Sequence, residues 1–143
     1  MTTTLRGVRD RWAARRHVTA LAVRYTAAVR EADVAAFRLH TERLTLLGAL
    51  GIEPCGPVSA ARRVELEGRH AALWLQVMAC RHAANRARAA LGIVRSPQFL
   101  RWCAETPGRP VDDVAVVSAF CAAHPGDPGV LDLSVRTELV PAR

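Results

Sequence analysis

The chain has 143 residues, and its 20 basic residues are all arginine, against 13 acids, which gives a formal net charge of +7. This length fits one domain with a modest hydrophobic core. The sequence lacks a Gly-rich phosphate loop, an H-E-x-x-H motif and a G-x-S-x-G motif, so we expect no enzymatic activity and no cofactor. Arginines interrupt any early apolar run, and no apolar run is long enough to cross a bilayer, so we expect a cytoplasmic protein with no membrane association.

Residues 5–50 are predicted to form one long helix, because no proline or glycine falls between Val8 and Leu47. Apolar and small side chains recur along this segment at the a and d spacing of a helix that packs against another helix. The residues of this seam are Val18, Leu21, Tyr25, Ala28, Ala32, Ala35, Leu39 and Leu46. A helix this long must lie against a partner helix or another subunit.

A second helix is predicted from Ser59, a good N-cap, to Leu91, after a turn at residues 53–57. The residues of its seam are Leu66, Leu73, Val77, Cys80, Ala84, Ala87 and Leu91. Gly and Ile follow both long helices, at 51–52 and 92–93, which is typical of a glycine C-terminal cap. We therefore expect an antiparallel hairpin of two long helices.

Two shorter helices are predicted next. Ser96 and Pro97 are typical of an N-cap and the first residue of a helix, which we expect to continue through Cys103. After a linker at residues 106–110, a further helix is predicted over residues 111–123. Its first turn contains Asp112 and Asp113, where the helix dipole favours acids.

The C-terminal segment 131–139 alternates apolar and polar side chains, which indicates a half-buried β-strand. A lone strand leaves its backbone groups without partners, so we expect it to pair with another copy or another protein. The residues expected to mediate this oligomerisation are Leu131, Leu133, Val135 and Leu139. The predicted fold is mainly α, a long antiparallel hairpin with two short helices and a C-terminal strand, self-associating. We expect residues 1–104 to form a basic helical-hairpin domain and residues 105–143 an acidic helix and strand segment, either in the same domain or as an oligomerisation tail.

The charge is uneven along the chain, at +5 for residues 1–49, +6 for residues 58–103 and −3 from residue 104 onward. Arginines spaced along helices suit phosphate contacts, so we expect a duplex nucleic acid as partner, bound with little sequence preference. The expected nucleic-acid-binding residues are Arg9, Arg11, Arg15, Arg16, Arg62, Arg69, Arg81, Arg88 and Arg95. The alternative is that these arginines keep a helical scaffold or adaptor soluble.

Other chemistry is less well supported by the residues. Arg11–His17 and Arg63–His70 fit the Arg-to-His spacing of the helical ribonucleases called HEPN domains, although a chain this rich in arginine gives such pairs by chance. Cys121 and His124 could supply half of a zinc site, but no second pair of ligands is visible, so a reduced, buried thiol is favoured. The three tryptophans are expected to be core anchors; they are Trp12, Trp74 and Trp102.

The order of elements over about residues 18–100 resembles that of one group of phage terminase small subunits. The residues that carry the resemblance are Leu50-Gly51-Ile52, Leu91-Gly92-Ile93 and the following Ser96-Pro97. The resemblance implies a ring-forming, DNA-binding protein that hands packaging-site DNA to a large ATPase–nuclease subunit. Many members carry an N-terminal helix-turn-helix, which this sequence lacks.

Overall fold

A 51-residue helix, α1 (Thr2–Ile52), opens the chain. The structure is a computed structural model that describes residues 2–52 and 60–138, with side chains over residues 5–50 and 60–137. The absence of proline and the scarcity of glycine in α1 allow an unbroken ladder of backbone hydrogen bonds. The predicted long helix is therefore confirmed, and it extends a few residues beyond the expected bounds.

Most of the rest of the described chain is also helical, which confirms the mainly α fold class. It forms α2 (Ala60–Val94), α3 (Pro97–Glu105), α4 (Asp113–Ala123) and α5 (Pro128–Glu138). The predicted N-cap at Ser59 and the turn at 53–57 lie outside the described residues.

The chain divides into two compact units. Unit 1 contains residues 1–29 and 85–143, and unit 2 contains residues 30–84. Unit 1 thus combines the N-terminal part of α1 and the end of α2 with α3, α4 and α5. The described residues of unit 2 belong to the remaining parts of α1 and α2.

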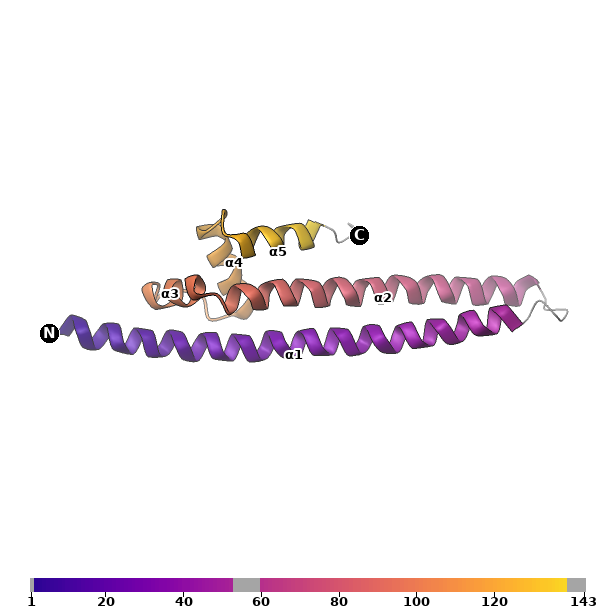
Figure 1. Cartoon of the computed structure of the whole chain (residues 1–143), viewed down its shortest axis with the longest axis horizontal. Helices are drawn as coiled ribbons and strands as arrows, with labels where there is room; N and C mark the ends of the chain where they lie inside the picture. Colours follow the sequence, from indigo (N-terminus) through magenta and orange to yellow (C-terminus); the bar gives the residue numbers. More distant parts are fainter. Residues whose placement is uncertain (1, 53–59, 139–143) are drawn as a thin grey trace. The chain divides into compact units, whose positions relative to one another are not determined.

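Both predicted seams are confirmed, because every residue named for them is buried or half-buried. In unit 2, α1 and α2 lie side by side and run in opposite directions (Figure 1). Leu46 on α1 and Leu73 and Val77 on α2 are buried there. The heptad spacing thus predicted correctly which face of each long helix is covered.

The predicted glycine caps are wrong. Gly51 is helical and α1 ends after it, at Ile52. Gly92 also lies inside its helix, because α2 continues to Val94. Two further residues of helix bring Ile93 and Val94, both almost fully buried, into the core of unit 1. The burial of two large apolar side chains outweighs the preference of glycine for a helix end.

The start of α3 is as predicted. Ser96 is the N-cap, its Oγ accepts a hydrogen bond from the Phe99 backbone N–H at 3.2 Å, and Pro97 begins the helix. The segment between Glu105 and Asp113 is a linker, as expected. Asp112 is the N-cap of α4 rather than a residue of its first turn, and its Oδ2 accepts from the Ala115 N–H at 3.0 Å.

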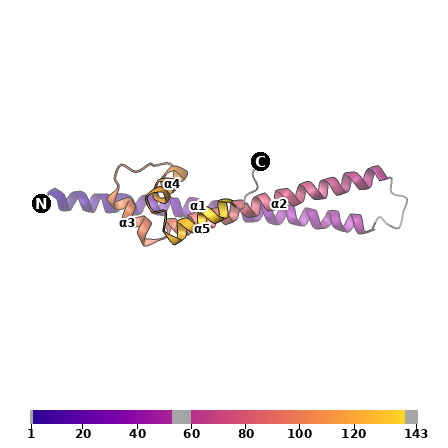
Figure 2. The same ribbon diagram turned by 90° about the horizontal axis from the view of Figure 1, so that it is seen from above.

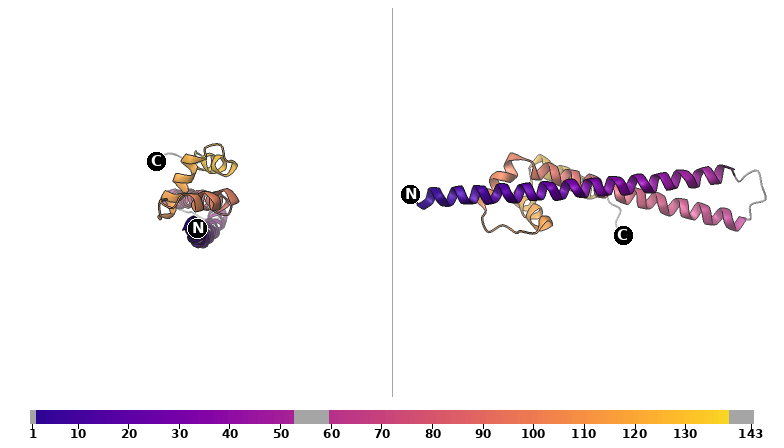
Figure 3. Two further views of the ribbon diagram at one scale, coloured as in Figure 1. Left: turned by 90° about the vertical axis from the view of Figure 1, so that its left-hand side faces the viewer. Right: turned by 90° about the horizontal axis from the view of Figure 1, so that it is seen from below.

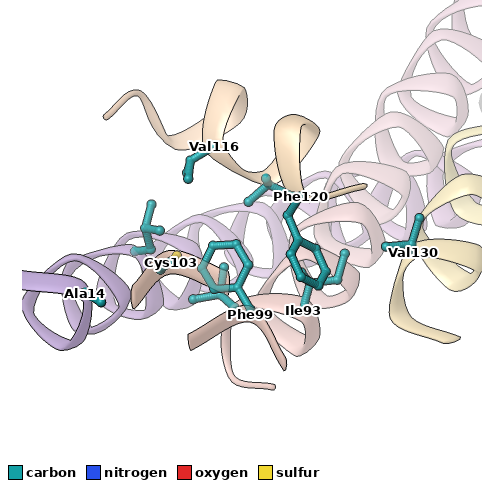
Figure 4. Close-up of a cluster of buried hydrophobic side chains, with 10 residues drawn as sticks. Ala14, Ile93, Phe99, Cys103, Val116, Phe120 and Val130 are labelled. Carbon is teal, nitrogen blue, oxygen red and sulfur yellow. The ribbon is translucent and has the colours of Figure 1, made fainter. Parts of the chain in front are cut away.

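The core of unit 1 collects side chains from all five helices. Figure 4 shows Phe99 and Cys103 of α3 facing Val116 and Phe120 of α4, with Ile93 of α2 beside them. The rings of Phe99 and Phe120 meet edge to face, with centroids 5.2 Å apart, a favourable geometry for aromatic pairs. The remaining buried members of this core are Ala14, Leu21, Val94, Val117 and Val130.

Polar contacts fasten α4 to α1. An Arg24 Nη1 donates to Asp113 Oδ1 at 2.6 Å, and the Tyr25 hydroxyl donates to the Asp113 carbonyl at 3.3 Å. These contacts place the start of α4 against the last turns of α1 that belong to unit 1, and Figure 2 shows α4 beside α1. The C-terminal end of the linker between α3 and α4 is therefore held against α1.

The predicted C-terminal strand is wrong, because residues 128–138 form α5. Val130 is buried and Leu133 is half-buried against the core of unit 1, at the i, i+3 spacing of one helix face. Asp127 and Pro128 start the helix, and an Asp132–Arg136 ion pair at 3.1 Å spans one turn. The alternation was misleading because, of the described apolar residues of segment 131–139, only Leu133 packs on the core, whereas Leu131 and Val135 are exposed.

The residues assigned to strand-mediated oligomerisation therefore do not share one face. Leu131 and Val135 are exposed and Leu133 packs on the core. Leu139 lies outside the described residues. Pairing of copies through a C-terminal strand loses its structural basis.

Candidate nucleic-acid interface

All nine arginines predicted to bind nucleic acid are exposed. The structure distributes them between the two units. Unit 1 contains Arg9, Arg11, Arg15, Arg16, Arg88 and Arg95, and unit 2 contains Arg62, Arg69 and Arg81. Arg88 donates to the Asn85 side chain at 3.4 Å and Arg11 Nε to the Gly7 carbonyl at 3.2 Å, both on their own helix.

In unit 1, two of the predicted arginines lie close to a third arginine between α1 and α3. A hollow of about 480 Å³ is lined by Arg11 and Arg15 from α1 and by Arg101 from α3. Its apolar lining includes Leu100 and Ala104, and Glu105 adds one carboxylate. We call this hollow the α1–α3 groove. Three guanidinium groups around an open, partly apolar groove suit a ligand with phosphates and a flat, apolar body.

Arg101 was not among the predicted residues. It lies in a short helix with no second arginine at helical spacing, so no column of charge marked it in the sequence. Only the packing of α3 against α1 brings it to Arg11 and Arg15.

Trp12 is not the core anchor that the sequence predicted, because it is 68% exposed. It lies two residues, or about 200° of helix rotation, from buried Ala14 and so on the outer face of α1. Trp74 is also exposed, whereas Trp102 packs against the core of unit 1 beside Phe120.

Two smaller hollows adjoin Trp12. One of about 260 Å³ is lined by Val8, Arg11, Trp12 and Arg15. Another of about 400 Å³ is lined by Trp12, Arg15, Arg16, Thr19 and Ala20. Arg15 borders both of these hollows and the α1–α3 groove. The indole and the guanidinium groups therefore form one neighbouring set on unit 1, which we call the Trp12–arginine surface.

His17 lies on a different hollow of unit 1, with Asp10 and Arg109. Arg109 Nε donates to His17 Nδ1 at 3.1 Å, and Arg109 Nη1 donates to the Cys103 carbonyl at 2.8 Å. Burial and the neighbouring Arg109 charge lower the pKa of His17. In the described structure its Nε2 is buried without a hydrogen-bond partner. The contact between Arg109 and His17 fastens the α3–α4 linker to α1.

The two Arg–His pairs with HEPN-like spacing are each directed to different surroundings. Arg11 lines the α1–α3 groove, whereas His17 lines the hollow beside Arg109. In unit 2, Arg63 pairs with Glu67 at 3.4 Å, and His70 contacts Arg43 at 3.5 Å. In the described structure, the arginine and the histidine of each pair therefore have different neighbours.

Metal ligands do not gather among the residues that the structure describes, where no group of three or more His, Cys, Asp or Glu could hold an ion. Cys80, Cys103 and Cys121 have free thiols. Burial raises the pKa of the Cys103 and Cys121 thiols. His124 stacks on the Phe120 ring at 4.3 Å, so it is held by the core next to Cys121.

Comparisons with protein-family models, curated proteins and solved structures give no match for this chain. Within the described ranges, no single helix has the length and apolar character to span a membrane; the pair α4 and α5, bent by 118°, meets these two criteria only when taken together.

Proposed function

We propose that the protein is a non-enzymatic nucleic-acid-binding assembly protein whose binding surface lies on unit 1. The observation that carries the proposal is the α1–α3 groove, where Arg11 and Arg15 of one helix meet Arg101 of another. Guanidinium groups from two helices can contact successive phosphates, and such contacts release counterions and give salt-dependent affinity.

The charge of unit 1 supports the same function. Unit 1 contains thirteen arginines and seven acids, so +6 of the net charge of +7 belongs to it. A solubilising set of charges has no need to be concentrated in one unit. The resemblance to phage terminase small subunits makes duplex DNA the first nucleic acid to test, and a larger ATPase the partner to seek.

The test compares two triple variants that remove the same charge. Arg11, Arg15 and Arg101 are replaced by Ala in unit 1, and Arg30, Arg38 and Arg63 are replaced by Ala in unit 2. Filter binding to a random duplex is measured over a series of salt concentrations. We expect the unit 1 variant to lower the log–log salt slope by up to about 0.9 for each phosphate that the protein no longer binds.

The unit 2 variant is expected to keep most of the affinity and the slope. Equal effects of the two triples would show that only net charge matters. Absence of binding by the unaltered protein at low salt, both to the duplex and to a single strand of the same sequence, would exclude the proposed function. Circular dichroism of both variants checks that the helices persist.

A self-associating helical scaffold is a second candidate, and unit 2 favours it. Phe37 on α1 and Leu75 on α2 are 72% and 68% exposed, with Val34, Leu44 and Val64 exposed as well. Exposed apolar faces of this kind mark protein–protein contacts. Sedimentation of a Phe37→Ser, Leu75→Ser variant tests this candidate, since a lower mass than that of the unaltered protein supports it and a monomer in both cases excludes it.

A further inference from the structure

The Trp12–arginine surface combines two features that a phosphate site alone does not require. An arginine groove suffices for backbone contacts, yet the indole of Trp12 is exposed directly beside it. An aromatic ring that stays in water does not contribute to the stability of the fold as a buried tryptophan does. Val8 and Leu5, one and two turns before Trp12, are exposed on the same face of α1. The first turns of α1 extend beyond α3, as Figure 3 shows, so this face is open in unit 1.

The hollows of this surface are also continuous. The three hollows on it adjoin one another through Arg15, which borders each of them. Trp12 borders two of the hollows, and Arg11 borders two. A ligand that follows these hollows first contacts the arginines of the α1–α3 groove, then the Trp12 indole and then Arg16. Guanidinium groups therefore lie on both sides of the indole.

We propose that Trp12 is a stacking platform for an unpaired base, and that the flanking arginines hold the adjacent phosphates of a single-stranded nucleic acid. The inference rests on the proposed function and adds the kind of nucleic acid. In a duplex, each base face is covered by its neighbours, so an indole on the protein surface cannot stack on it. In a single strand, a splayed base can lie on the ring while the backbone follows the positive groove.

An anionic lipid surface is the main alternative for an exposed tryptophan among arginines. A helix that lies on a membrane needs an apolar face clear of charge and a flat or convex surface. Here Arg15 follows Trp12 by one turn on the same face, and it also lines the groove between α1 and α3. These features favour a flexible strand over a flat bilayer.

The experiment uses the full chain and a labelled oligodeoxythymidylate of about ten nucleotides, together with a mixed-sequence duplex of the same length, in fluorescence anisotropy. Trp12→Ala is compared with Trp12→Phe, which keeps a ring, and with Phe37→Ala, which removes an equally exposed aromatic ring from unit 2. We expect Trp12→Ala to weaken single-strand binding about 5- to 150-fold, the value of one stacked base. Duplex binding should change less than about twofold.

Trp12→Phe should recover most of the single-strand affinity, and Phe37→Ala should leave it unchanged. The salt slope of Trp12→Ala should equal that of the unaltered protein, because the phosphate contacts remain. Trp12 is exposed and alanine favours helix, so this variant should fold, which circular dichroism verifies.

Each other outcome overturns the inference in a recognisable way. Duplex binding that is as tight as single-strand binding, with no effect of Trp12→Ala, refutes stacking and leaves the proposed function intact. No binding to either nucleic acid refutes both. Vesicles containing phosphatidylserine form the last arm, and binding to them that depends on Trp12, without single-strand binding, assigns the surface to lipid.

Discussion

Units 1 and 2 are built from the same two long helices, yet they differ in both charge and core. Unit 2 contains seven arginines and six acids, against thirteen and seven in unit 1. Among the described side chains of unit 2 the buried apolar residues are Ala36, Leu46, Leu73, Val77 and Ala84. Unit 1 buries two phenylalanines in an aromatic cluster that also includes Trp102.

The difference follows from the number of helices that meet. Two helices alone cover one face of each other, so large side chains on the outer faces of unit 2 remain in water. In unit 1, α3, α4 and α5 cover the helix end at Val94 and the seam of α1. The additional helices therefore supply the core, and α3 also forms the α1–α3 groove with α1, so stability and the proposed binding surface depend on the same packing.

A half-buried arginine makes a further contact in unit 2. The Arg43 guanidinium lies 4.6 Å from the centre of the Trp74 ring and contacts His40 and His70. A cation over an indole face is a favourable arrangement that holds both side chains along the helix pair. Unit 2 thus has a half-buried cation–π contact between its two helices, whereas unit 1 has buried aromatic pairs.

The largest expected effect separates the two cores. Phe120→Ala in unit 1 should lower the free energy of unfolding by about 3–5 kcal/mol, because it removes a fully buried ring. Phe37→Ala in unit 2 should change it by less than about 0.5 kcal/mol, because that ring is exposed. Urea denaturation measures both. Similar losses for the two variants would show that the outer face of unit 2 is covered.

A smaller effect tests the helical tail of unit 1. Leu133→Asp should cost about 2 kcal/mol, since it places a carboxylate against the core. Val135→Asp should cost under about 1 kcal/mol, because Val135 faces water and only the helix dipole opposes the charge. Urea midpoints of the pair decide the matter. In a strand, Leu133 and Val135 would lie on the same face, so an equal loss of stability in the two variants would favour the strand over the helix.

The smallest expected effect is a pH dependence of unit 1. The pKa of His17 is lowered from 6.5 by burial and by Arg109, so the unfolded chain takes up a proton at a higher pH than the folded chain does. Neutral His17 therefore makes its full contribution to the free energy of unfolding above about pH 6.5, and this contribution declines as the pH falls toward the folded-state pKa. His17→Asn keeps an acceptor for Arg109 without titrating.

The measurement compares urea midpoints at pH 7.5 and pH 5.5 for the unaltered protein and for His17→Asn. The unaltered protein should lose more stability over this interval, while the other histidines contribute equally to both. A variant as pH-dependent as the unaltered protein would mean that His17 does not titrate differently on folding.

The sequence predicted a large part of the fold because its local signals agree with the tertiary contacts. The heptad spacing identified the covered face of both long helices, and Ser96-Pro97 identified the start of α3. These signals act through neighbouring residues on one helix, so they can be recognised without knowing the partner. The exposed stripe of Leu5, Val8 and Trp12 has the same helical spacing, and it could have been recognised as a second face.

Three features were decided by tertiary structure. Ile93 and Val94 extend α2 past Gly92 because the core of unit 1 receives them, and Val130 and Leu133 make the tail helical because the same core covers that face. Arg101 joins Arg11 and Arg15 only through the packing of α3 on α1.

Sequence by itself determined which residues favour helix and where its apolar seams run, since these depend on neighbours along the chain. Which helix ends, faces and charges meet depends on burial between distant segments, because the free energy of burial exceeds the local preference of a single glycine or of an alternating pattern.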